Sequence, residues 1–283
     1  MFPNGILIVF IVSLLMCCMG FKKFVWFMSV GYGLSAAGIG AALLVMSLVR
    51  GQYSIIYLVQ CVLFVVYGIR LGGFLLIREL KNDKYKAKLA EAGGEAKVPV
   101  FVAAVMWIFM GALYVAQASP AFYRLANGLA KAPNTAAYIG TAISAIGIVL
   151  EALSDKQKSA QKAKNPNMPA MEGLFKMCRC PNYFGEILFW TGVFVSGIGA
   201  VKSSQWVIST IGYVLIVFIM LSGAKRLETR HIKHYGKNAQ YIAYADKTPL
   251  IIPLIPLYHM TSEEKIAAEE KAKAEKKAKK AGK

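Results

Sequence analysis

The feature that most constrains this chain is a series of apolar runs, each about long enough to cross a lipid bilayer. A spanning helix needs about 20 mainly apolar residues, and an open strand would leave backbone polar groups without partners in hydrocarbon. Hydrophobic residues make up 57% of the 283, more than in a typical soluble domain. The sequence therefore predicts an all-α, polytopic membrane protein with seven transmembrane helices, at residues 4–20, 24–49, 54–77, 98–119, 135–153, 183–201 and 205–224.

The basic residues predict how these helices are oriented. A net charge of +18 would by itself suit a nucleic-acid-binding protein, but the charge is unevenly distributed. Most of the 33 lysines and arginines fall in alternate loops, at 21–23, 78–97, 154–182 and 225–283. Lys and Arg are enriched in cytoplasmic loops. We therefore expect an N-terminus outside, a cytosolic C-terminus and no nucleic-acid partner.

One membrane domain is expected over residues 1–260, with substrate-side helices in 1–134 and a cofactor-binding half in 135–260. Residues 261–283, of Ala, Glu and Lys, are expected to form a charged cytosolic tail, because this composition is typical of solvated or disordered segments. The connector 154–170 contains Lys, Gln and Pro and is expected to be flexible. The pattern Cys178-x-Cys180 lacks a second ligand pair, so no metal site is predicted.

Arg70 is a charged residue inside the third apolar run, and Tyr67 lies one turn earlier on the same helix face. A charge within a span costs roughly 2.5–3.5 kcal/mol on insertion scales, and it is tolerated when it is paired or faces an aqueous cavity. Tyr67 falls near the bilayer midplane, where a phenol could polarise the carbonyl of a lipid-soluble substrate. The alternative is a packing role for Tyr67 and a snorkelling Arg70.

Acidic residues are absent before Glu79, and those at later helix ends fall on the predicted cytosolic side. Glu151 and Asp155 are four residues apart, with Lys158 and Lys162 on nearby faces. Such a group is either an ion-paired helix end or a nucleotide site, in which the carboxylates accept ribose hydroxyls and the lysines contact phosphate.

Residues 179–186 read Arg-Cys-Pro-Asn-Tyr-Phe-Gly-Glu and open the sixth run. Asn182 and Glu186 share one helix face, either as a capping pair or as a binding edge. The segment resembles the nicotinamide-proximal motif of the steroid 5-alpha-reductase family, including its bacterial relatives with a DUF1295 domain. Weaker similarity runs from about Glu151 to Pro253, with a further match at Tyr67-Gly-Ile-Arg70.

This resemblance implies a membrane-embedded, NADPH-dependent reductase that transfers hydride to the C=C bond of an α,β-unsaturated carbonyl. The substrate would be lipophilic, a 3-oxo-Δ4-steroid or an isoprenoid enone, and would enter from the membrane lipids. Tyr67 would be the catalytic carbonyl donor. The residues implied to bind the cofactor are Arg70, Glu151, Asp155, Lys158, Lys162, Arg179, Asn182, Glu186, Glu228, His231 and Tyr235.

The chain departs from the family pattern at two places. Relatives often have His where Cys180 stands, and their Tyr is usually assisted by a Glu on the preceding helix. Because no acid occurs in residues 1–78, we expect Gln52 or Gln60 to take the place of that Glu.

Two other functions fit part of the sequence. The Arg-x-Pro-x-Tyr-x-Gly pattern of S-adenosylmethionine-dependent isoprenylcysteine and phospholipid methyltransferases is matched by Arg179, Pro181, Tyr183 and Gly185. Those enzymes also share a Glu- and Tyr-rich C-terminal segment that ends in Ile-Pro, as Ile252-Pro253 does here. An inactive lipid-binding relative is the third hypothesis. The predicted location is a bacterial inner membrane or the endoplasmic reticulum, with the cofactor site facing the cytosol. The oligomeric state is left open, a monomer included.

Overall fold

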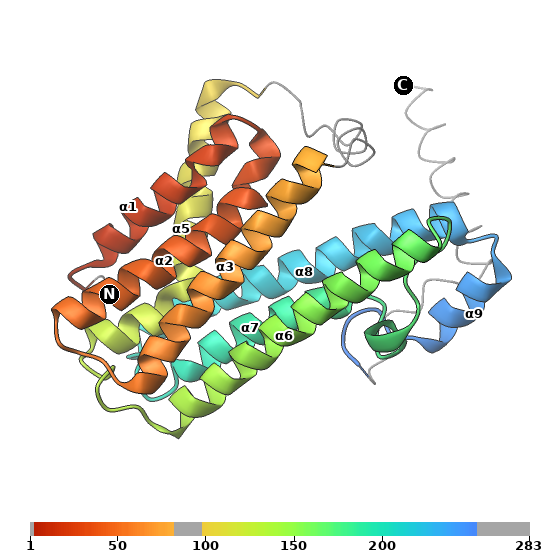
Figure 1. Cartoon of the computed structure of the whole chain (residues 1–283). Helices are drawn as coiled ribbons and strands as arrows, with labels where there is room; N and C mark the ends of the chain where they lie inside the picture. Colours follow the sequence, from red (N-terminus) through yellow and green to blue (C-terminus); the bar gives the residue numbers. More distant parts are fainter. Residues whose placement is uncertain (1–2, 82–97, 254–283) are drawn as a thin grey trace. The chain divides into compact units, whose positions relative to one another are not determined.

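A computed structural model describes residues 3–81 and 98–253 (Figure 1), and within these ranges the chain is helical and contains no strand. The all-α class is therefore confirmed, while the tail 261–283 and most of the loop 78–97 lie outside the described residues. The helices are α1 Ile6–Cys17, α2 Val30–Val49, α3 Ile55–Lys81, α5 Val100–Ala126, α6 Thr135–Lys164, α7 Pro181–Ser196, α8 Gln205–Tyr235 and α9 Ala239–Lys247, with short 3-10 turns at Cys18–Phe21, Phe24–Phe27 and Gly173–Lys176.

Within the described ranges, five helical segments are long and apolar enough to cross a membrane, which makes the chain a multi-pass membrane protein. They are Phe24–Val49, Ile55–Arg78, Val100–Ala126, Thr135–Lys164 and Gln205–Tyr235. The other two predicted spans are shorter as helices: Ile6–Phe21 is apolar but brief, and α7 has 16 residues. A full crossing takes about 20 residues at the helical rise, so length supports five of the seven predicted spans.

The predicted flexible connector 154–170 is wrong in its first part, because α6 continues to Lys164. Lys, Gln and Ala are good helix formers, and two glutamines of this stretch also hold the returning chain. The Gln161 Oε1 accepts hydrogen bonds from the backbone N–H groups of Met171 and Glu172, at 2.9 and 3.0 Å. The Gln157 Oε1 accepts one from Leu174 N–H at 2.9 Å. The following loop is thereby fixed against α6.

The chain forms two compact units. The first, called here the aromatic unit, comprises Met1–Ala145 and Phe189–Ile216; the second, the charged unit, comprises Ile146–Leu188 and Val217–Lys283. Helices α6, α7 and α8 contribute residues to both units.

Glycines allow close helix contacts in the aromatic unit, where α1, α2, α3 and α5 pack together (Figure 1). A Cβ added to Gly68 of α3 would lie 2.3 Å from the carbonyl oxygen of Gly33 and 2.4 Å from the backbone nitrogen of Ala37, both in α2. Small residues let membrane helices approach backbone to backbone, where van der Waals packing replaces the hydrophobic effect. The glycine-rich second run is thus a packing surface for α3.

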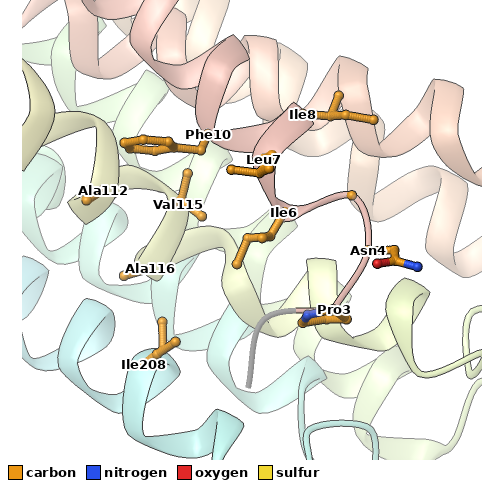
Figure 2. A pocket seen from close by; sticks show the side chains of 11 residues that line it. Pro3, Asn4, Ile6, Leu7, Ile8, Phe10, Ala112, Val115, Ala116 and Ile208 are labelled. Carbon is orange, nitrogen blue, oxygen red and sulfur yellow. The ribbon is translucent and has the colours of Figure 1, made fainter.

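The aromatic unit also contains a cavity of about 670 Å³, formed by the start of α1, the middle of α5 and Ile208 of α8 (Figure 2). Its lining is apolar apart from Asn4 and the nearby backbone. Such a cavity suits a hydrocarbon group and offers no charged partner to a nucleotide. None of the residues predicted to act in catalysis or cofactor binding lines it.

Candidate functional site

The charged unit collects most of the predicted site residues on three helices. Glu151, Asp155, Lys158 and Lys162 lie on α6, Asn182 and Glu186 on α7, and Glu228, His231 and Tyr235 on α8, while Arg179 precedes α7. Residues separated by up to 84 positions in the sequence are therefore assembled in one compact unit. The aromatic unit contains the other two predicted residues, Tyr67 and Arg70 of α3.

Basic side chains gather between α6 and α8, and Lys158, Lys162 and His231 are together called here the cationic face. The Lys162 Nζ donates a hydrogen bond to the Tyr235 hydroxyl at 2.9 Å, and it lies 5.3 Å from the centre of the same ring. The imidazole of His231 packs edge-on against Tyr235, with 5.7 Å between ring centroids. Lys158, Lys162 and Arg179 are all near enough for their positive charges to act on His231. This concentration of positive charge is suited to anionic groups such as phosphates.

Arg179 and Glu228 form a buried ion pair between the start of α7 and α8; their side chains are 3% and 1% exposed. The Tyr241 hydroxyl of α9 donates a hydrogen bond to the same carboxylate oxygen at 3.2 Å. Burial raises the pKa of Tyr241, so its phenol stays protonated and able to donate. Sequence reasoning missed Tyr241, because only the fold brings α9 to Glu228.

The start of α7 carries Asn182 and Glu186, the two polar residues of the motif at 181–186 that were predicted to bind the nicotinamide. Glu186 is 5% exposed and Glu151 is 2% exposed. The Asn182 Oδ1 is buried and has no hydrogen-bond partner among the residues that the structure describes. An unsatisfied buried acceptor costs about 1–3 kcal/mol. It is therefore a position at which a ligand N–H would restore a lost interaction.

Gly185 brings this edge close to α6. A Cβ at Gly185 would lie 2.8 Å from the backbone nitrogen of Glu151 and 2.8 Å from the carbonyl oxygen of Gly147. Any side chain here would push the two backbones apart. The glycine of the motif therefore has a packing role, and it allows the backbones of α6 and α7 to approach closely.

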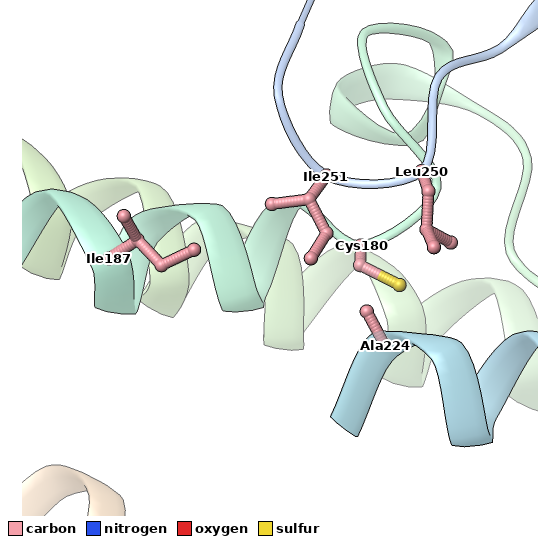
Figure 3. Packing of buried hydrophobic residues seen from close by; sticks show 5 residues of the cluster. All are labelled: Cys180, Ile187, Ala224, Leu250 and Ile251. Carbon is pink, nitrogen blue, oxygen red and sulfur yellow. The ribbon is translucent and has the colours of Figure 1, made fainter. Parts of the chain in front are cut away.

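Cys180, where relatives often carry His, is buried in an apolar cluster with Ile187, Ala224, Leu250 and Ile251 (Figure 3). The backbone N–H groups of Arg179 and Cys180 donate to the carbonyl oxygens of Pro249 and Leu250, at 2.8 and 2.9 Å. Burial raises the pKa of the Cys180 thiol to about 12, so the thiol is neutral and packs as a small hydrophobe. Where relatives often have a polar imidazole, this protein therefore has a small side chain that packs in an apolar cluster.

The aromatic unit encloses the hydroxyl of Tyr67, which is fully buried. It lies 2.7 Å from the hydroxyl of Tyr32, and the Trp190 Nε1 donates to the Tyr32 hydroxyl at 2.5 Å. The Tyr67 ring stacks on Phe189 at 4.0 Å with an interplanar angle of 9°. Arg70, one turn further along α3, is half-buried.

The expectation that Gln60 partners Tyr67 is wrong. The Gln60 Nε2 donates instead to the Ser196 Oγ at 2.6 Å, and Tyr32 takes the place beside Tyr67. No spacing rule could have found Tyr32 or Trp190, because they lie 35 and 123 positions from Tyr67 in the sequence.

A family model described as a protein of unknown function (DUF1295) matches residues 16–248. No curated protein and no solved structure matches the chain. The match includes every residue predicted to act in catalysis or cofactor binding.

Proposed function

Given that the chain belongs to the DUF1295 family, we propose that it is a membrane-embedded, NADPH-dependent reductase of the steroid 5-alpha-reductase type. It would reduce the C=C bond of an α,β-unsaturated carbonyl in a lipophilic substrate, such as a 3-oxo-Δ4-steroid or an isoprenoid enone. The observation that carries the proposal is the buried, unsatisfied Asn182 Oδ1 in the unit that also contains the cationic face.

The donors and acceptors of the charged unit fit the cofactor. The Asn182 Oδ1 would accept from the carboxamide N–H of the nicotinamide, with Glu186 one turn along α7 as a second acceptor. Glu151 and Asp155 would accept ribose hydroxyls. NADPH, when bound, supplies the hydride.

The cations of the same unit would hold the phosphates. Lys158 and Lys162 of α6 would supply the direct contacts, with Tyr235 orienting the ammonium of Lys162. Arg179 is paired with Glu228, so it would position the start of α7 for the cofactor rather than supply net charge to a phosphate. His231 lies among these cations and would contact the cofactor beside Tyr235. Arg70 is assigned to the cofactor by the family motif alone.

In the aromatic unit, Tyr67 would donate a hydrogen bond to the substrate carbonyl as negative charge develops on its oxygen. A donor aimed at developing charge in a dry site contributes about 2.7–4 kcal/mol to transition-state stabilisation. The buried, stacked ring of Tyr67 holds its hydroxyl in one position, which lowers the reorganisation that the reaction requires. An apolar substrate would reach this unit from the bilayer.

The distribution of Lys and Arg supports an orientation with the charged unit toward the cytosol, where NADPH is available. The N-terminus would then lie outside, in a bacterial inner membrane or in the endoplasmic reticulum.

A methyltransferase is the second candidate, because the structure brings two parts of that pattern together. Backbone hydrogen bonds join Arg179 and Cys180 to Pro249 and Leu250, which places the Arg-x-Pro-x-Tyr-x-Gly motif beside the segment that ends in Ile252-Pro253. S-adenosylmethionine carries no phosphates, so the cationic face would have no counterpart in that ligand.

Ligand binding to the detergent-purified full chain distinguishes the two candidates. We expect NADPH to raise the thermal unfolding midpoint and Asn182→Ala/Glu186→Ala to abolish that shift. Asn165→Ala/Glu172→Ala is the matched control, since these residues have the same chemistry but lie on the exposed loop of the same unit. Stabilisation by S-adenosylmethionine alone would overturn the reductase proposal.

A further inference from the structure

We infer that Tyr32 is the positioning residue for Tyr67, in the role that an acidic side chain fills in related reductases. The effect of Tyr32 on catalysis rests on the proposed function. The hydrogen bond between Tyr32 and Tyr67 rests only on the geometry of the aromatic unit. Trp190, Tyr32 and Tyr67 form a hydrogen-bonded chain across three helices, α7, α2 and α3.

Chemistry fixes the direction of the first of these hydrogen bonds and allows one direction for the second that leads toward a substrate. An indole N–H can only donate, so the Tyr32 oxygen is the acceptor from Trp190. A phenol has one proton to donate, and Tyr32 can direct it to the Tyr67 oxygen at 2.7 Å. Each phenol oxygen then accepts one hydrogen bond from its neighbour. In this arrangement Tyr32 does not receive the Tyr67 proton, which in the proposed reaction would form the hydrogen bond to the substrate carbonyl.

The buried surroundings strengthen the hydrogen bond between Tyr32 and Tyr67. Tyr32, Tyr67 and Trp190 are 6%, 0% and 2% exposed. Hydrogen bonds in series polarise one another, and they are stronger in a medium of low dielectric constant. A hydrogen bond donated to the Tyr67 oxygen stabilises negative charge there, which makes its own O–H a better donor. A neutral phenol thus does what a carboxylic acid would do, without a buried charge.

Aromatic packing holds the side chains of Trp190, Tyr32 and Tyr67 in place. Phe189 stacks on Tyr67, and the rings of Tyr32 and Trp190 lie 6.3 Å apart at 30°. Tyr114 also packs against Tyr32, with centroids 5.2 Å apart, but its hydroxyl donates to the Phe27 carbonyl oxygen at 2.5 Å. Tyr114 is therefore a buried tyrosine of the same cluster whose hydroxyl proton goes to a backbone carbonyl, and it provides a matched control.

The first test needs no substrate. Tyrosine labelled with 13C at Cζ reports hydrogen bonding at each phenol by NMR, and Tyr67→Phe identifies the resonance of Tyr67. We expect Tyr32→Phe to move that resonance and Tyr114→Phe to leave it within its line width. An unmoved resonance in a folded Tyr32→Phe protein would overturn the inference, whether or not the protein reduces any enone.

The second test measures NADPH-dependent reduction of progesterone, a 3-oxo-Δ4-steroid used here as the probe. Loss of one neutral hydrogen bond of about 0.5–1.5 kcal/mol predicts a fall in kcat of up to about tenfold for Tyr32→Phe, and a smaller fall for Trp190→Phe. The KM for NADPH should not change, and Tyr114→Phe should keep the wild-type kcat. An equal fall in Tyr114→Phe would indicate a merely structural role and would overturn the inference. Failure of the wild type to bind NADPH would refute the proposed function instead, and the NMR result would still decide the hydrogen bond.

Discussion

The buried polar groups around Tyr67, in the aromatic unit, and around Glu228, in the charged unit, are accommodated by different physical means. In the aromatic unit the buried groups at Tyr67 are neutral, and phenol and indole groups hydrogen-bond one another. In the charged unit a guanidinium and a carboxylate are buried together, and lysines gather around His231. Neutral groups are cheap to bury when they are hydrogen-bonded, whereas charges need a partner of opposite sign. The first environment suits the carbonyl of an apolar molecule, and the second suits ionised phosphates. The proposed function requires both, because its substrate is apolar and its cofactor carries phosphates.

The largest expected effect tests the charged unit. Breaking a buried ion pair by removing one partner typically costs about 3–5 kcal/mol. We therefore expect Glu228→Leu and Arg179→Met each to lower the thermal unfolding midpoint strongly. The double variant should recover much of the loss, because it leaves neither charge buried without the other. Arg226→Met is the control, because it changes an exposed arginine of α8, the helix that carries Glu228. If the losses of the two single variants simply add in the double variant, Arg179 and Glu228 are not a coupled pair.

The second-largest expected effect is a loss of catalytic rate without a loss of cofactor binding. Tyr67→Phe removes the proposed carbonyl donor and should lower the kcat for progesterone by about 10²–10³, the usual cost of losing one such donor. NADPH binding should be retained, because Tyr67 is not among its proposed ligands and all of those except Arg70 lie in the charged unit. Tyr57→Phe is the control on α3, since the buried Tyr57 hydroxyl donates to the Ala121 carbonyl oxygen. A matching loss of activity in that variant would argue that Tyr67 only packs.

The smallest effect concerns helix packing in the aromatic unit. Gly68→Ala introduces a Cβ against the backbone of α2, and overpacking of this kind costs about 1–3 kcal/mol. At Gly73, on the same helix, an added Cβ would meet nothing within 4 Å, so Gly73→Ala should be neutral or slightly stabilising. Thermal unfolding of the two variants measures the difference. Equal midpoints would show that α2 and α3 do not depend on this close approach.

Much of the architecture follows from local properties of the sequence. Apolar length predicts helices at all seven runs, and the positions of Asn182 and Glu186 four residues apart predict one shared face. Helix ends are less well predicted: α6 and α8 continue well past the apolar residues, because polar helix formers extend a helix once membrane burial has begun it. Apolar composition alone does not fix the number of spans, since α7 and the Ile6–Phe21 segment are apolar but short.

The sequence by itself determined that this protein is a bundle of apolar helices with polar groups at particular helix positions, because hydropathy and helical periodicity are local. Only the tertiary structure decided which of those groups meet. Tyr32 rather than Gln60 lies against Tyr67, Arg179 is neutralised by Glu228, and Tyr241 joins that pair from α9. These contacts depend on how helices far apart in the chain rotate and approach, and the close approach of α2 to α3 is set by backbone contacts at Gly33 and Gly68, which no local pattern encodes.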